Sequence, residues 1–218
     1  MNRSLSFESL WSRRGLLAIG AVAFFATLAA TIPASALLSA SGIERRGVSY
    51  TKVQGSLWRG EITGLSVRGV HLGSVRYELH LSALLRGRLE ARLNAGGGDI
   101  TGEGVASAGL GGAVSLRNAR FDVDLSAMRG FGFLGYPLEG AARADIRVLE
   151  VSKRGCRRAD ADVWTDALTG PARRMNGQGF AMSGKAACAG DDLVIDLAGS
   201  GDEGDATLRL SLAPDLAY

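Results

Sequence analysis

The chain is poor in the residues that most often carry chemistry. Its 218 residues include two histidines, two cysteines and four prolines, and aromatic residues make up only 6%. No Gly-x-Ser-x-Gly elbow presents a serine nucleophile, and no Gly-Lys-Ser/Thr sequence follows a glycine-rich stretch to hold a phosphate. These absences argue against a serine hydrolase and against a P-loop nucleotide enzyme.

Clusters of basic residues are also absent. The formal net charge is only +3, and the basic residues are spread along the chain. A protein that binds nucleic acid needs basic residues gathered on one element, often with aromatic residues between them. We therefore expect no nucleic-acid partner.

Glycine is the most over-represented residue, with 31 copies. Glycine at this level disfavours a helical bundle and suits many short strands joined by tight turns. Apolar and polar residues alternate at 120–125, 142–148 and 206–212, which gives each predicted strand one apolar and one wet face. The sequence predicts a mainly β domain, built as a curved antiparallel meander, with short helical turns at 81–85 and 125–129.

No charged residue occurs between positions 15 and 43. As a helix, the apolar part of this stretch would span roughly 27 Å, enough for the hydrocarbon core of a bilayer. Arg13 and Arg14 at its start favour a cytoplasmic N-terminus. We predict a cytoplasmic tail at 1–14, a transmembrane helix at 15–38 and a periplasmic β-rich domain at 39–218. The alternative is a cleaved twin-arginine signal, with a cleavage site at Ala34-Ser35-Ala36.

The two cysteines, Cys156 and Cys188, both lie in the exported part of this prediction. In an oxidising compartment, two cysteines on a sheet domain most simply form one disulfide. Two buried free thiols are the alternative. A zinc site is disfavoured because the histidines, His71 and His80, lie far upstream and no second cysteine pair exists.

Other candidate residues have structural explanations. His71 and His80 are expected to be ordinary surface or half-buried side chains. The acidic loop at 199–205 lacks the repeated units that calcium-binding loops use, so a solvated hairpin turn is expected. Trp58 and Trp164 are expected to close the ends of a small core. The sequence predicts no catalytic residue, no metal ligand and no cofactor.

A short motif lies just beyond the predicted membrane helix. Gly55, Leu57, Trp58 and Gly60 form a Gly-x-Leu-Trp-x-Gly turn, in which both glycines can adopt a positive φ and the indole can fold onto a sheet face. The order of segments resembles the type II secretion system protein N family. The further segments that carry this resemblance are Leu72–Tyr77, Leu84–Leu89, Pro137–Gly140 and the Cys156 to Cys188 spacing, whereas Tyr77 stands where the family often has tryptophan.

The resemblance implies a single-pass inner-membrane accessory component of the machine that exports folded periplasmic proteins. It implies neighbouring inner-membrane subunits of that system as partners, and neither catalytic residues nor a cofactor. A sheet behind a membrane anchor also resembles the AsmA-like envelope proteins, whose open β-groove shields lipid tails. An open, concave apolar face would favour contact with lipid, whereas a closed core with a polar rim would favour the secretion role.

Overall fold

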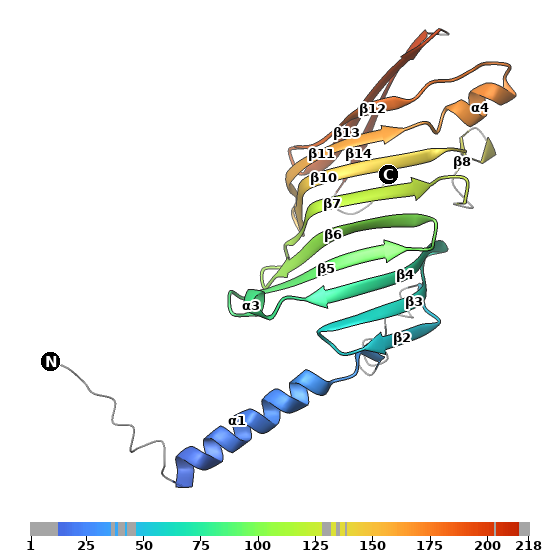
Figure 1. Ribbon diagram of the computed structural model, residues 1–218. Coiled ribbons are helices and arrows are strands. Elements are labelled where there is room, and N and C mark those ends of the chain that lie inside the picture. Colours follow the sequence, from blue (N-terminus) through green and yellow to red (C-terminus); the bar gives the residue numbers. More distant parts are fainter. Residues whose placement is uncertain are drawn as a thin grey trace.

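The computed structural model describes residues 13–35, 38, 42, 47–127, 132–133, 136–137, 139–202 and 204–213. Figure 1 shows an N-terminal helix followed by one long sheet. The helices are α1 (Arg13–Thr31), α3 (Leu81–Leu84) and α4 (Thr169–Arg174). The strands of the sheet are β1 (Val48–Ser49), β2 (Lys52–Gly55), β3 (Arg59–Val67), β4 (Val70–Leu79), β5 (Arg88–Gly96), β6 (Ile100–Gly109), β7 (Val114–Asp124), β10 (Ala141–Ser152), β11 (Gly155–Thr165), β12 (Met182–Ala189), β13 (Asp192–Gly201) and β14 (Gly204–Leu212).

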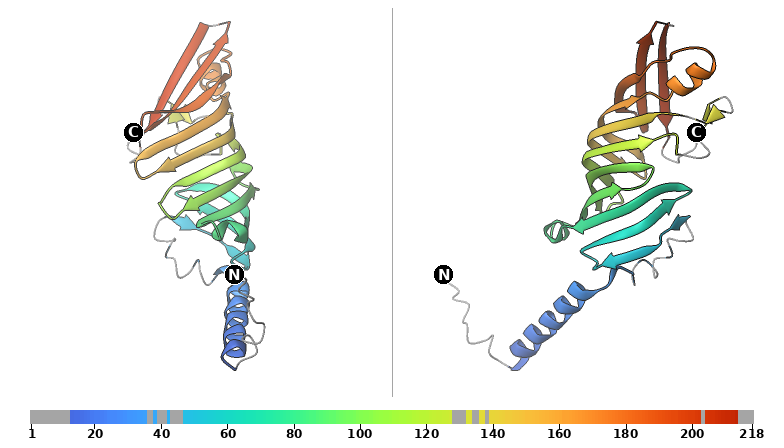
Figure 2. Two further views of the ribbon diagram at one scale, coloured as in Figure 1. Left: turned by 90° about the vertical axis from the view of Figure 1, so that its left-hand side faces the viewer. Right: turned by 45° about the vertical axis from the view of Figure 1, so that its right-hand side comes forward.

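The twelve strands follow one another across the sheet almost in chain order, from β1 through β3 and β4 to β14, while β2 pairs with β3. Each described strand pair is antiparallel. The two-residue strands β8 (Gly132–Phe133) and β9 (Tyr136–Pro137) form a separate small hairpin. Figures 1 and 2 show a single, strongly twisted layer whose last strands turn away from the first. The predicted antiparallel meander is confirmed.

The three alternating segments all lie in strands, within β7, β10 and β14. One detail of the alternation is wrong. The pairing of β10 with β11 shifts by one residue between Ile146 and Val148, so Arg147 forms a bulge. A bulge exchanges the faces of the residues beyond it, and Leu149 therefore takes the place that the simple alternation gave to Val148.

The glycine-rich region around residues 94–112 covers the end of β5, the turn after it, all of β6 and the start of the β6–β7 turn. Close packing explains one of its glycines. A Cβ added at Gly104 would lie 2.5 Å from the Cβ of Ala119 on the neighbouring strand β7. Ala119 is itself only 3% exposed. Glycine is therefore required at this position because β6 and β7 approach each other too closely for a second side chain.

The short helices agree with the sequence in part. The predicted turn at 81–85 is the helix α3, whereas residues 125–127 form a turn without a helix and residues 128–129 lie outside the described part. The helix α4 was not predicted, because its sequence Thr-Gly-Pro-Ala-Arg-Arg is typical of a turn. It lies in the long connection between β11 and β12, where Gly170 is buried against Glu139.

The predicted membrane segment at 15–38 is helical through α1 as far as Thr31, and Ala34, Ser35 and Leu38 are again helical after Pro33. Ile32 precedes Pro33, and a residue before proline disfavours the helical conformation. Within the described part of the chain, no helix combines the length and the apolar character needed to cross a bilayer. The transmembrane helix, its orientation and the boundaries at 1–14, 15–38 and 39–218 remain predictions.

Candidate functional site

The strand registers divide the sheet into two chemically different faces. Side chains of directly paired residues point to the same side of a sheet, so each face can be followed from strand to strand. We call one side the charged face and the other the apolar face. Both faces can be followed across the described sheet because residues of neighbouring strands are paired from β3 to β14.

The charged face carries a row of polar side chains that crosses the sheet from β3 to β14. Each member is the registered partner of the next. The nitrogen Nε of Arg120 lies 2.6 Å from Asp145 Oδ1, and that of Arg209 lies 2.9 Å from Asp196 Oδ1. The row contains Glu61, Arg76, Asn94, Glu103, Arg120, Asp145, Asp162, Lys185, Asp196 and Arg209.

The bulge at Arg147 creates a small ion-pair network on this face. The guanidinium donates to Asp160, with Nε 2.8 Å from Oδ2, and to Asp162, with Nη1 2.6 Å from Oδ2. These hydrogen bonds lower the pKa of both carboxyls and raise the pKa of Arg147. Because about half of each side chain is exposed, the network contributes little to stability and mainly keeps this face hydrated and charged.

Trp164 also lies on the charged face, as the registered partner of Arg143. The Arg143 guanidinium carbon is 5.5 Å from the centroid of the indole, within cation–π range. Together with Asp145, Asp162 and Lys185, these two residues line a shallow depression. The prediction that Trp164 closes an apolar core is therefore wrong, since its ring packs beneath a guanidinium.

The apolar face is continuous along the other side of the sheet. Phe121 pairs with Ala144, and Ala144 pairs with Val163, which carries one row across β7, β10 and β11. Leu208 and Leu210 continue such rows on β14, opposite Leu197 and Ile195 of β13. Burial on this face falls sharply at the last strand: Leu197 on β13 is 5% exposed, whereas Leu210 on β14 is 44% exposed.

The described residues place no second sheet or long helix over the apolar face. Extensive contacts in this part of the protein occur between neighbouring or next-neighbouring strands, within the small β8–β9 hairpin, and between α3 and the end of β5. A two-layer sandwich would show contacts between strands distant in the sheet. The described sheet is therefore a single layer, with an apolar face of the kind that usually contacts a partner or a lipid.

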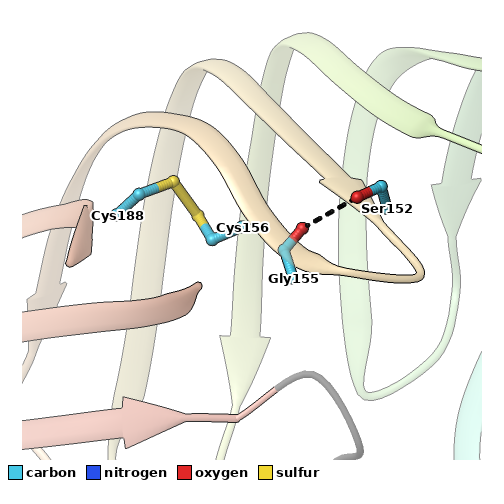
Figure 3. Close-up of a disulfide and its surroundings, with 4 residues drawn as sticks. All are labelled: Ser152, Gly155, Cys156 and Cys188. Carbon is cyan, nitrogen blue, oxygen red and sulfur yellow. Dashed lines mark hydrogen bonds between the residues drawn. A yellow bond between two sulfur atoms is a disulfide. The ribbon is translucent and has the colours of Figure 1, made fainter. Parts of the chain in front are cut away.

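The predicted disulfide between Cys156 and Cys188 is confirmed (Figure 3). It joins the neighbouring strands β11 and β12, with a Cα–Cα distance of 5.6 Å. Cys156 is registered with Val151, so the bridge lies on the apolar face. The main-chain amide of Cys156 also donates to the carbonyl of Asp191, 2.7 Å away, which ties the start of β11 to the β12–β13 turn.

The Gly-x-Leu-Trp-x-Gly motif forms the turn between β2 and β3. Gly55 has the expected positive φ of 101°, but Gly60 has no positive φ and lies in β3. Gly60 is instead needed for space, because a Cβ there would lie 2.4 Å from the Gln54 carbonyl and 2.7 Å from the Tyr77 hydroxyl. Tyr77 donates that hydroxyl to the Ser56 carbonyl at 2.7 Å. Tyrosine at this position thus fastens the turn to β4.

The same turn connects the N-terminal helix to the sheet. The amide of Leu57 donates to the carbonyl of Ile32 at 3.0 Å, directly after α1. Pro33 forms an isolated bridge with Ser56. Trp58 is half-buried, and its carbonyl accepts the Leu79 amide at 2.6 Å. The role of Trp58 as a packing residue stays a prediction, but the motif clearly occupies the junction between helix and sheet.

The remaining candidates do not assemble into a catalytic or metal site. His71 and His80 lie at opposite ends of β4, and His80 Nδ1 is 3.7 Å from Glu90 Oε1. Residues 199–202 and 204–205 lie in the hairpin between β13 and β14, as expected. In the part of the chain that the structure describes, no three His, Cys, Asp or Glu side chains are grouped closely enough to hold a metal ion.

These features define a class of protein: a single-layered antiparallel sheet, preceded by an apolar helix and stapled by one disulfide. The sequence profile of the family "Type II secretion system (T2SS), protein N" matches residues 46–217. The chain belongs to this family.

A relative named "Type II secretion system protein N", from Vibrio cholerae serotype O1, is 29% identical over 163 residues. The match covers 69% of this chain and 63% of the relative, so the chain spans less than two thirds of the length of that protein. No solved structure matches the chain.

Proposed function

We propose that this chain is a non-enzymatic, inner-membrane-anchored component of the type II secretion machinery, and that it acts through its open sheet. Membership of the protein N family supports a place in that system. The observation that carries the proposed mode of action is the single-layered sheet, whose two broad faces have opposite chemistry. Such a sheet offers surface for assembly and does not enclose a reaction chamber.

The anchor in this proposal is the predicted segment at 15–38, which includes most of α1. Leu16, Leu17, Ile19 and Phe24 of that helix are all more than half exposed, as expected for side chains that would face lipid. The disulfide fits an oxidising compartment such as the periplasm. N-terminal sequencing of the mature protein from fractionated cells tests the anchor. A soluble product that begins at Leu37 would contradict it.

Partner binding is proposed at the outer edge of β14, the last strand of the described sheet. An unpaired edge can accept an extended segment of a neighbouring subunit. A photo-crosslinking residue at Thr207 on β14 should capture an inner-membrane secretion subunit in cells. The matched control is Thr101, which is also exposed but lies on the interior strand β6. Equal capture at both positions would contradict edge binding.

Deletion of the gene with two parallel measurements tests the function as a whole. Loss of type II exoproteins from the culture medium, with an intact outer membrane, is the expected result. The full chain should restore secretion. Normal secretion beside a leaky outer membrane would contradict the secretion role and favour the second candidate function.

The second candidate is contact with lipid tails along the apolar face, as in an AsmA-like groove. The exposed leucines of β14 and the lack of a second layer over the described sheet favour it. The purified full chain should then retain phospholipids, which mass spectrometry of the bound fraction would detect. Leu208→Lys should lower the retained amount, whereas Thr207→Lys, on the opposite face of β14, should not. Equal retention by both variants would contradict lipid binding on this face.

A further inference from the structure

One end of the sheet gathers exposed leucines. In an antiparallel meander, alternate turns lie at the same end, and these include the connection from β4 to β5, the β6–β7 turn and the β10–β11 turn. We call these three turns, residues 80–87, 110–113 and 153–154, the leucine rim. Leu85 is 91% exposed and Leu110 is 94% exposed, and Leu81 and Leu84 of α3 are also exposed.

The turns of the leucine rim lie next to one another. A Cβ added at Gly87 would lie 3.3 Å from Leu110 Cδ1, which places the β6–β7 turn beside the loop after α3. A Cβ added at Gly112 would lie 3.5 Å from Lys153 Cε, which places the β10–β11 turn beside the β6–β7 turn. The leucines and the basic side chains of these turns therefore form one patch.

The charge of the leucine rim is positive. Arg86, Lys153 and Arg154 lie in its turns, and Arg88 begins β5. The β12–β13 turn at the same end adds the carboxylate of Asp191. Exposed leucines surrounded by arginine and lysine are typical of surfaces that dip into the interface of an anionic bilayer.

The opposite end of the sheet has different chemistry. Its described turns and connections contain Asp99, Glu139, Asp166 and Asp202. They also contain Arg68 and the two arginines of α4, of which Arg174 forms an ion pair with Glu139. The sheet is thus polarised, with a basic, leucine-rich end and an end richer in carboxylates.

The N-terminal helix joins the sheet at the leucine rim. Arg59, at the start of β3, is registered with Glu78 near the end of β4. The carbonyl of Trp58 accepts the amide of Leu79, two residues before α3 begins, and the amide of Leu57 binds the carbonyl of Ile32. Figure 1 shows α1 leaving the sheet close to the end that carries α3. A bilayer that holds α1 would therefore lie nearest to this end.

We propose that the leucine rim is a second membrane contact, which inserts Leu85 and Leu110 into the interface of an anionic bilayer while Arg86, Lys153 and Arg154 bind lipid phosphates. The contact holds the sheet end-on to the membrane and directs the carboxylate-rich end away from it. This inference rests on the anchored arrangement proposed above, and it assigns the sheet an orientation that the anchor alone does not fix.

Depth-dependent fluorescence quenching tests the proposal with the full chain in vesicles. The variant Leu110→Cys provides one free thiol, because Cys156 and Cys188 are bridged. An environment-sensitive dye at this position should be quenched by lipids brominated on their acyl chains in phosphatidylethanolamine–phosphatidylglycerol vesicles. The matched control is Asp202→Cys, on the exposed β13–β14 turn at the opposite end, where the dye should remain unquenched.

The basic residues are tested by charge reversal in the same assay. Each lysine or arginine close to an anionic bilayer contributes about 1 kcal/mol to the free energy of membrane binding. Arg154→Glu should therefore lower the ratio of membrane-bound to unbound leucine rim at least about fivefold. The control Arg173→Glu changes an exposed arginine of α4 at the opposite end and should leave the ratio unchanged. Equal quenching of the Leu110 dye in neutral phosphatidylcholine vesicles would overturn the proposal.

Vesicle flotation separates this inference from the proposed anchor. If the protein floats with vesicles in high salt but the Leu110 dye stays unquenched at low salt, the rim contact is wrong and the anchor stands. If the protein floats only at low salt and the Leu110 dye is quenched there, the anchor is wrong and the rim contact is supported. Quenching that requires another secretion subunit would assign the rim to a protein partner and overturn the membrane contact.

Discussion

Removal of the Cys156–Cys188 bridge gives a stability change whose size follows from the fold. The bridge joins residues 32 apart in the sequence, on adjacent strands. For a loop of this length, the chain-entropy relation predicts a loss of about 3.7 kcal/mol when the cross-link is removed. Cys156 lies on the apolar face and is 8% exposed, so alanine at both positions adds no unpaired polar group.

The assay is equilibrium urea unfolding of the full chain in detergent, followed by tryptophan fluorescence. The double variant Cys156→Ala/Cys188→Ala should lose about 3–4 kcal/mol, with a larger dependence on urea because its unfolded state is more expanded. Reduction of the wild-type protein should give the same loss. A loss below about 1 kcal/mol in both experiments would refute the argument that the bridge acts by restricting the unfolded chain.

Three further predictions concern the packing, the charge network and the helix–sheet junction. Gly104→Ala should destabilise the protein by about 1–3 kcal/mol because of its contact with Ala119, whereas Gly96→Ala, which has open space, should be neutral or slightly stabilising in the same unfolding assay; similar losses would contradict the packing argument. Arg147 lowers the pKa of Asp160 and Asp162, so these carboxyls stabilise the fold above their unfolded pKa of about 3.9 and lose that effect as the pH falls through their folded pKa. The melting temperature of Arg147→Met should consequently fall less than that of wild type below about pH 4, and parallel curves would be the contrary result. Tyr77→Phe removes the hydrogen bond to Ser56 and should cost about 1 kcal/mol in urea unfolding; an unchanged midpoint would show that the turn does not depend on this bond.

The sequence was sufficient for the strands and the disulfide because both follow from local patterns. Alternation at 120–125 and 206–212 marks a strand with one apolar face wherever that strand pairs. In an oxidising compartment, a chain with two cysteines can form only one internal disulfide, which joins these two residues. The Gly-x-Leu-Trp-x-Gly turn was also visible, although steric crowding by Tyr77, and not a positive φ, explains Gly60.

The continuous apolar face could not be predicted in the same way, because it depends on bulges. At Arg147, β10 contains one residue more than its neighbour β11. At Asn118, whose φ is 46°, β7 contains one residue more than its neighbour β6. These bulges return Leu149 and Leu116 to the apolar face beyond them. Simple alternation places both leucines on the wrong side. The position of Trp164 on the charged face and the gathering of leucines at one rim likewise depend on register and turn length.

Secretion by strains with altered sheet faces tests the central claim most directly. The measurement is the amount of type II exoprotein in the medium of a deletion strain that carries either Leu210→Arg or Thr101→Arg at equal protein levels. Both residues are exposed, but Leu210 lies on the apolar face of the edge strand β14 and Thr101 lies on the charged face of the interior strand β6. The account predicts that Leu210→Arg lowers secretion because it places a charge on the apolar face of the proposed binding strand, while Thr101→Arg secretes as wild type does. Wild-type secretion by both strains would contradict the claim that the protein acts in secretion through its open sheet.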